Sequence, residues 1–383
     1  MSEGLFKFEN CLLKHHVRVE GWLPFCRARL RSIRDGRPAA NSRRLRYFTF
    51  CAVGAIDVLM LDVENVIGRS KNQGFDNVVF FDIDAARVTD TQKRIPGAVG
   101  FPGDFVDVVL HGEPLDEADA DDADEALAAP PTMPNDRKTR LEQMRRAQRR
   151  DFIRRFPFDV VNLDLEEYLF KPSEELPGRV INAVRKIFAW QQRPIKENTS
   201  EERLDGFSLM ITTQVGPENL SNQYLDMLQE MLADNMARDS TLAVRLRERC
   251  GIDDIATLRG MQFDTFFKVG VAKTVLSMLR EEDWHVDAAS GIRVFQFERP
   301  IDAERTYTML HFVMDVRRNQ PPIHKRGPGV VSRQGEAAYA DVVRQIFRDE
   351  PEVVSESSID TERLKSSLAK ISGRRKKYME NRS

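Results

Sequence analysis

Residues 293–298, R-V-F-Q-F-E, and residues 307–316, Y-T-M-L-H-F-V-M-D-V, decide the fold that this sequence predicts. Both runs are rich in β-branched and aromatic side chains, and only about eight residues separate them. Strands this close in the chain pair antiparallel, so we expect a hairpin. His311 alternates with apolar residues of the second run, and we expect it in the core rather than at a ligand.

Five earlier runs read as strands that are buried on both faces, because each is short, continuous and apolar. They are Tyr47–Ala52, Asn77–Ile83, a run within Ala98–Leu110, Phe158–Leu165 and Phe207–Thr213. Helical stretches lie between them, up to Ile67 and over Gly178–Gln191, and a further one, Phe263–Glu282, precedes the hairpin. Strands that alternate with helices predict an α/β, doubly wound sheet.

Composition bounds the class of protein. Hydrophobic residues make up 41% of the 383 residues, which suffices for a sizeable core and excludes wholesale disorder. The 58 basic and 60 acidic residues nearly cancel, which excludes a uniformly basic nucleic-acid binder. No apolar run is long enough to span a bilayer and no secretion signal is visible, so we expect a cytoplasmic protein without membrane contact. The four cysteines form no C-x-x-C pair, so we expect free thiols and no metal site.

Charge is arranged in blocks along the chain. Residues 113–125 hold eight acids and no base, and the proline-rich run that follows makes 113–136 an expected disordered insertion. Basic blocks lie at 18–46, 137–155 and 364–383. We therefore expect an N-terminal basic segment at 1–44, a main domain at 45–320 with that insertion and a helical one at 217–262, and a helical basic tail at 330–383.

The order of five parallel-type strands, a helix and a closing hairpin resembles the class I S-adenosylmethionine-dependent methyltransferase superfamily over about residues 45–318. The resemblance implies a Rossmann-like sheet of order 3-2-1-4-5-7-6 with helical additions, and S-adenosylmethionine as the cofactor. It also implies a glycine-rich turn after the first strand. In F-T-F-C-A-V-G-A-I-D-V, residues 48–58, only Gly54 matches that turn.

The resemblance further implies roles for acids at the strand ends. In the family, an acid after the second strand accepts hydrogen bonds from ribose hydroxyls, and Asp82 matches it by spacing, with Asp84 as a second choice. Asp104 and Phe105 match the residues that meet the adenine after the third strand. The alternative for these acids is a structural one, because Asp is also a preferred helix cap and turn residue.

The fourth strand carries the catalytic position in many family members, and polar residues gather at its end. The resemblance implies that Asn162 or Asp164 accepts hydrogen bonds from a target amine, and that Tyr168 stacks on a flipped base. The Pro-Pro pair of the enzymes that methylate exocyclic amines is absent, and a solvated turn before a helix explains the acids equally well.

Two basic segments are candidate phosphate contacts, with solvated helices as the alternative. The arginines concerned are Arg145, Arg146, Arg149, Arg150, Arg374 and Arg375. The leading hypothesis is thus a methyltransferase with DNA or RNA as its candidate acceptor. A second hypothesis is a catalytically degenerate methyltransferase fold that binds nucleic acid or scaffolds other subunits; the chain is also similar in general character to methyltransferase-like proteins of bacterial antiviral defence. A nicotinamide-dependent oxidoreductase is disfavoured, because the hairpin is present and G-x-G-x-x-G is missing.

Overall fold

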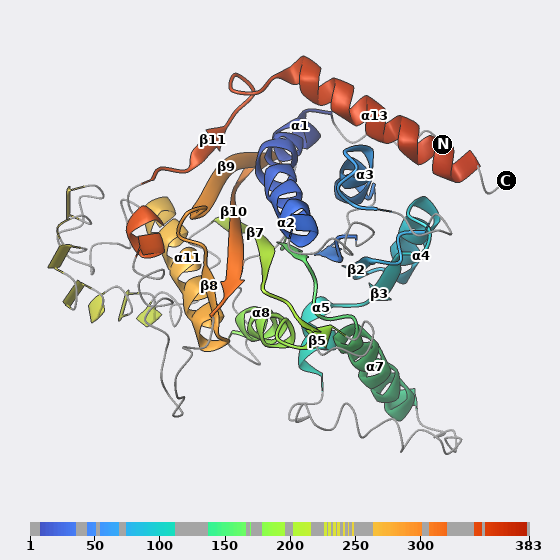
Figure 1. The fold of residues 1–383 in the computed structure, drawn as a ribbon, viewed down its shortest axis with the longest axis horizontal. Helices are drawn as coiled ribbons and strands as arrows, with labels where there is room; N and C mark the ends of the chain where they lie inside the picture. The colour runs from blue at the N-terminus through green and yellow to red at the C-terminus, as the bar shows by residue number, and fades with distance from the viewer. Residues whose placement is uncertain are drawn as a thin grey trace.

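A computed structural model gives the fold (Figure 1). It describes residues 8–35, 44–50, 54–68, 74–111, 137–165, 169, 178–195, 202–215, 263–300, 306–319, 341–346 and 349–380, with short helical pieces between 226 and 248. The predicted insertion at 113–136 and most of the helical insertion at 217–262 lie outside these residues. The described elements form a mixed α/β structure with a central, mostly parallel sheet flanked by helices.

The sheet has the order β11-β9-β10-β7-β4-β1-β2-β3. Its strands are β1 (Tyr47–Phe50), β2 (Val78–Asp82), β3 (Val99–Pro102), β4 (Val160–Asp164), β7 (Gly206–Val215), β9 (Ile292–Pro300), β10 (Thr306–Arg318) and β11 (Glu352–Val354). The short β8 (Trp284–Val286) pairs with β10, and β5 (Pro194–Ile195) pairs with β6 (Glu202–Arg203) in a separate ribbon. From β3 to β7 every neighbouring pair is parallel.

The predicted hairpin is confirmed. β9 and β10 pair antiparallel from Thr306 opposite Pro300 to Met314 opposite Ile292. β10 also pairs antiparallel with β7 along most of its length, so it lies between β7 and β9. The run within Ala98–Leu110 is a shorter strand than expected, because Gly103 turns the chain at a φ of 115° and a helix begins at Phe105.

A layer of helices covers each face of the sheet. Because successive side chains of a strand point to opposite faces, each layer packs on its own hydrophobic core. One core contains Phe48, Val161 and Leu209 under α5 (Phe105–Leu110), α7 (Arg137–Arg154), α8 (Arg179–Trp190) and α11 (Phe263–Glu281). The other contains Tyr47, Val160 and Met210 under α1 (Phe8–His16), η1 (Val17–Trp22), α2 (Leu23–Asp35), α3 (Ile56–Val63), α4 (Ala85–Arg94) and α13 (Thr361–Glu380).

Helix α13 crosses the outside of the second layer and contacts α1, α3 and α4 (Figure 1). Within the predicted tail at 330–383, the sequence pattern favours a helix at 360–372. The helix continues to Glu380, and Tyr378 near its end is buried against Phe75. Cys26 of α2 is a buried free thiol, and burial raises the pKa of that thiol. None of the helices that the structure describes is sufficiently long and apolar to cross a membrane.

Candidate functional site

The turn after β1 is sharp. Gly54 is buried, and Ala55 follows it at a φ of 47°, in the left-handed region that is rare for a residue with a side chain. Helix α3 begins at the next residue, Ile56. Strained backbone conformations of this kind are frequent at ligand sites. The turn is therefore a candidate site on structural grounds as well as from the sequence pattern.

The acids at the ends of β2 and β3 divide into two kinds. Asp84 caps α4, since its carboxylate accepts a hydrogen bond from the Ala86 amide at 2.8 Å. Asp104 caps α5 and accepts bonds from the amides of Val106 and Asp107 at 2.7 and 3.1 Å. The capping alternative therefore describes both residues.

Asp82 is different, because it caps no helix. Its Oδ1 accepts a hydrogen bond from the Asp84 amide at 3.0 Å. The side chain is half-buried at the end of β2. Phe105, expected beside a base, is 7% exposed and packs edge-on against Phe50 at a centroid distance of 4.8 Å.

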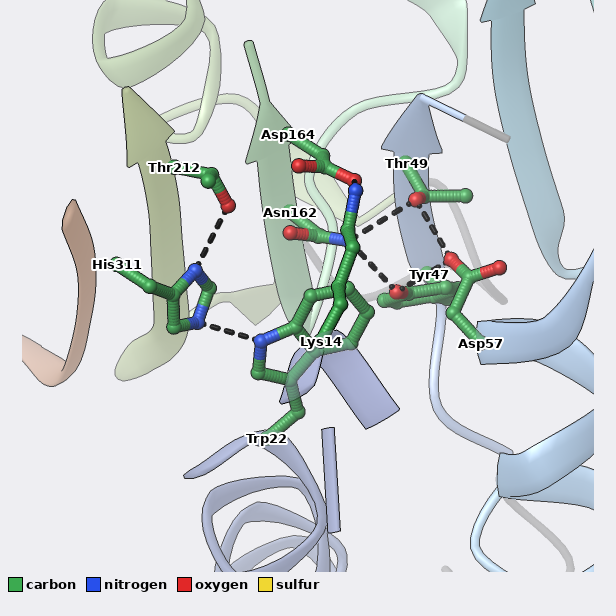
Figure 2. Close-up of polar contacts among 9 residues, drawn as sticks. All are labelled: Lys14, Trp22, Tyr47, Thr49, Asp57, Asn162, Asp164, Thr212 and His311. Atoms are coloured by element: carbon green, nitrogen blue, oxygen red, sulfur yellow. Dashed lines mark hydrogen bonds and ion pairs between the residues drawn. The ribbon is translucent and has the colours of Figure 1, made fainter. Parts of the chain in front are cut away.

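A buried polar cluster lies on the opposite face of the strands, under α1 and η1 (Figure 2). Asn162 donates to the hydroxyls of Tyr47 and Thr49, each at 3.1 Å. Both hydroxyls in turn donate to Asp57 of α3, at 2.9 and 2.8 Å. Asn162 is fully buried, and its Oδ1 has no hydrogen-bond partner within the part of the chain that the structure describes. The predicted catalytic amide is thus held by two strands and a helix.

Asp164, the predicted catalytic acid, forms an ion pair with Lys14 of α1 (Figure 2). The Lys14 Nζ lies 2.5 Å from Asp164 Oδ2, and both side chains are largely buried. Burial alone would raise the pKa of Asp164, but the Lys14 ammonium, together with the charge of Arg18, outweighs it and holds the pKa of this carboxyl below its usual value. Asp164 is therefore ionised at neutral pH.

His311 of β10 completes the cluster (Figure 2). Trp22 Nε1 donates to His311 Nε2 at 2.5 Å, and the other ring nitrogen lies 2.7 Å from the Thr212 hydroxyl. Burial lowers the pKa of His311 to about 3, so the ring is neutral. The expected core position of His311 is confirmed. Lys14, Trp22, Tyr47, Thr49, Asp57 and Thr212 were not predicted as part of this cluster. The isolated Asp57 within the apolar run of α3 was the available signal.

The remaining predicted residues do not join this cluster. Tyr168 lies outside the described residues. Arg145, Arg146 and Arg150 lie along α7, partly or fully exposed, whereas Arg149 is 4% exposed and donates from Nε to the Val109 carbonyl at 3.0 Å. Arg149 is thus packed within the helical layer, and its predicted contact with phosphate stays a prediction. On α13, Arg374 lies 3.5 Å from Asp62, and Arg375 is partly exposed.

A family model described as PP_RS20740-like matches residues 137–371, which include β4, β7, the hairpin and most of α13. No curated protein and no solved structure matches the chain.

Proposed function

The chain belongs to the PP_RS20740-like family, and from the geometry of its sheet we propose that it binds S-adenosylmethionine and transfers the methyl group to an acceptor. The observation that carries the proposal is the place of β10. Five parallel strands are followed by a strand that lies antiparallel between β7 and β9. Counted without β5, β6, β8 and β11, this arrangement supports the order 3-2-1-4-5-7-6 of the methyltransferase superfamily.

The proposed cofactor site lies at the carboxyl ends of β1 and β2, where ligands bind in open α/β sheets. The Asp82 carboxylate suits the ribose hydroxyls, because it lies half-buried at the end of β2 and caps no helix. The strained Gly54–Ala55 turn suits the methionine portion. Asp104 and Asp84 remain proposed neighbours of the cofactor, although their Oδ1 atoms already cap helices. The cofactor supplies an activated methyl group, and the protein's task is to align the acceptor with it.

One observation favours a second candidate, a methyltransferase fold that binds without catalysis. The proposed acceptor position holds Asp164 in an ion pair with Lys14, and Asn162 is committed to Tyr47 and Thr49. A carboxylate neutralised by an ammonium accepts more weakly from a target amine. In either candidate, the exposed arginines Arg145, Arg146 and Arg150 are the proposed contacts to DNA or RNA.

Calorimetric titration with S-adenosylmethionine and with S-adenosylhomocysteine tests the proposed cofactor. We expect both to bind, and Asp82→Ala to weaken binding by about 1–3 kcal/mol through the loss of hydrogen bonds to a charged group. Asp90→Ala is the matched control, because Asp90 is an exposed acid on α4, the helix that follows β2. Equal affinities of wild type and Asp82→Ala would remove Asp82 from the site, and no binding of either compound would refute both candidates.

Methyl transfer separates the two candidates. We expect the wild type to transfer label from methyl-labelled S-adenosylmethionine to DNA or RNA. Asn162→Ala is expected to abolish the transfer and to retain cofactor binding. Cofactor binding without any transfer, to either acceptor, would favour the second candidate.

A further inference from the structure

Arg18 of η1 is a buried cation without an anionic partner among the residues that the structure describes. Arg18 is 5% exposed, and among the described residues neither its Nε nor its Nη1 has a hydrogen-bond acceptor. Its contact is with an aromatic face, since its guanidinium carbon lies 5.5 Å from the centre of the Trp22 ring. Burial of an unpaired charge is strongly unfavourable, and stacking on an indole offsets only a small part of that cost.

The surroundings of Arg18 carry an excess of positive charge. Arg18 lies against Trp22, which donates to His311, and His311 contacts Thr212, the residue opposite Asp164 on the sheet. In keeping with this position, Arg18 lowers the pKa values of His15, Asp164 and His311. Burial chiefly, with Arg18 as a further cause, lowers the pKa of each histidine to about 3, so both rings are neutral. Lys14 and Arg18 therefore both lie near the Asp164 carboxylate, which is already paired with Lys14.

Acceptor atoms without donors lie on the strand beneath these cations. Oδ1 of Asn162 and Oδ1 of Asp164 are both buried, and neither has a hydrogen-bond partner among the described residues. The two residues are two positions apart on β4 and point to the same face. A buried guanidinium without an acceptor and buried oxygens without a donor are the complementary halves of a polar binding site.

We propose that Arg18 anchors a binding site for the carboxylate or phosphate of a small molecule, whose hydroxyl or amino group is bound by Asn162 and Asp164. Arg18 of η1, Asn162 and Asp164 are each less than a tenth exposed, and the two strand residues lie beneath α1 and η1. The site shares Asn162 and Asp164 with the proposed acceptor position, and it is distinct from the arginines of α7 and from the proposed cofactor site at β1 and β2.

Thermal unfolding in different anions tests the site without any assumption about catalysis or cofactor. Wild type, Arg18→Met and Arg31→Met are unfolded in potassium chloride, potassium phosphate and potassium acetate at equal ionic strength. We expect phosphate, acetate or both to stabilise the wild type relative to chloride, with about an elevenfold gain in the folding constant at ten times Kd. Met keeps the length and apolar contacts of the Arg18 side chain, and Arg31 is an exposed arginine of α2 that serves as the matched control.

The proposal requires that Arg18→Met loses this stabilisation and that Arg31→Met keeps it. A response to acetate alone identifies a carboxylate ligand, and a response to phosphate alone identifies a phosphate ligand. Equal stabilisation of wild type and Arg18→Met would place the anion elsewhere and overturn the proposal. If Arg18→Met does not fold, the wild type alone still tests the proposal. A wild type that is stabilised by neither phosphate nor acetate overturns it. Calorimetry with S-adenosylmethionine remains independent of all these outcomes.

Discussion

At the scale of single residues, the two acids after β2 have separable roles. Asp84 caps α4, so we expect Asp84→Ala to lower the free energy of unfolding by about 0.5–2 kcal/mol. Asp82 caps no helix, and Asp82→Ala is expected to change stability less than Asp84→Ala does. Urea denaturation of both variants measures the difference. A larger loss in Asp82→Ala would assign the structural role to that residue instead.

Asp164 is expected to link stability to pH. Its folded pKa lies below the ordinary value of about 3.9, so the stabilisation is present above that value and is lost as pH falls through the folded pKa. Asp164→Asn leaves Lys14 without this carboxylate and should cost about 3–5 kcal/mol at pH 7. The difference from wild type should shrink below about pH 4. Urea denaturation from pH 7 to pH 3 measures it, and a difference that is independent of pH would contradict the ion pair.

The role of a residue was predictable from the sequence only where its partners are close to it in the chain. The sequence offered capping as the alternative for Asp84 and a turn as the alternative for Asp104. Both residues cap helices, through bonds that reach only two or three residues ahead. Lys14 and Asp164 are 150 positions apart, and no local pattern links them. The buried state of Arg149 was also hidden, because its place on α7 depends on a contact with Val109 of α5.

At the scale of elements, α13 is held by a buried polar contact. The Tyr378 hydroxyl donates to Asp62 of α3, and Arg374 lies 3.5 Å from the same carboxylate. We expect Tyr378→Phe to cost about 1–3 kcal/mol, because Asp62 loses a donor in a buried position. Met379→Ala is the control, since Met379 is 52% exposed and should change stability by less than about 0.5 kcal/mol. Equal effects in chemical denaturation would show that α13 is not anchored at Asp62.

Helix α7 is the element for which nucleic-acid binding can be tested. Replacement of Arg145, Arg146 and Arg150 by Gln keeps the buried Arg149 and should flatten the dependence of log affinity on log salt by about 0.9 per lost phosphate contact. Fluorescence anisotropy with a labelled duplex measures the slope. Arg87→Gln with Lys93→Gln, two exposed cations of α4, is the matched control. An unchanged slope in the triple variant would mean that α7 does not contact phosphate.

The elements themselves were largely predictable, and their ends were not. The hairpin was readable because two β-rich runs stand eight residues apart, and the parallel strands because each is a short apolar run. Helix α13 extends beyond the predicted end because Leu364, Ile371 and Tyr378 recur every seven residues and are all buried. Gly373 does not end the helix, since its surroundings are open and nothing there requires a turn.

At the scale of the whole molecule, the ends of the described chain share one core with the sheet. Trp22 and Tyr378 belong to the same buried cluster as Tyr47, Val78 and Val313. Trp190 and Trp284 belong to the core on the other face. We expect tryptophan fluorescence and far-ultraviolet circular dichroism to report coincident unfolding transitions. Two separate transitions would show that the helices around Trp22 unfold independently of the sheet.

The place of β10 also has a consequence for synthesis on the ribosome. β7 ends at residue 215, and its antiparallel neighbour begins only at residue 306, after α11 and β9 have been made. At about 5–20 residues per second, this edge of the nascent sheet waits on the order of 5–20 s for its partner. An apolar strand with an open edge is a template for pairing with other chains. A nascent chain of this protein is therefore a natural client for chaperones at the stage when β7 has emerged and β10 has not.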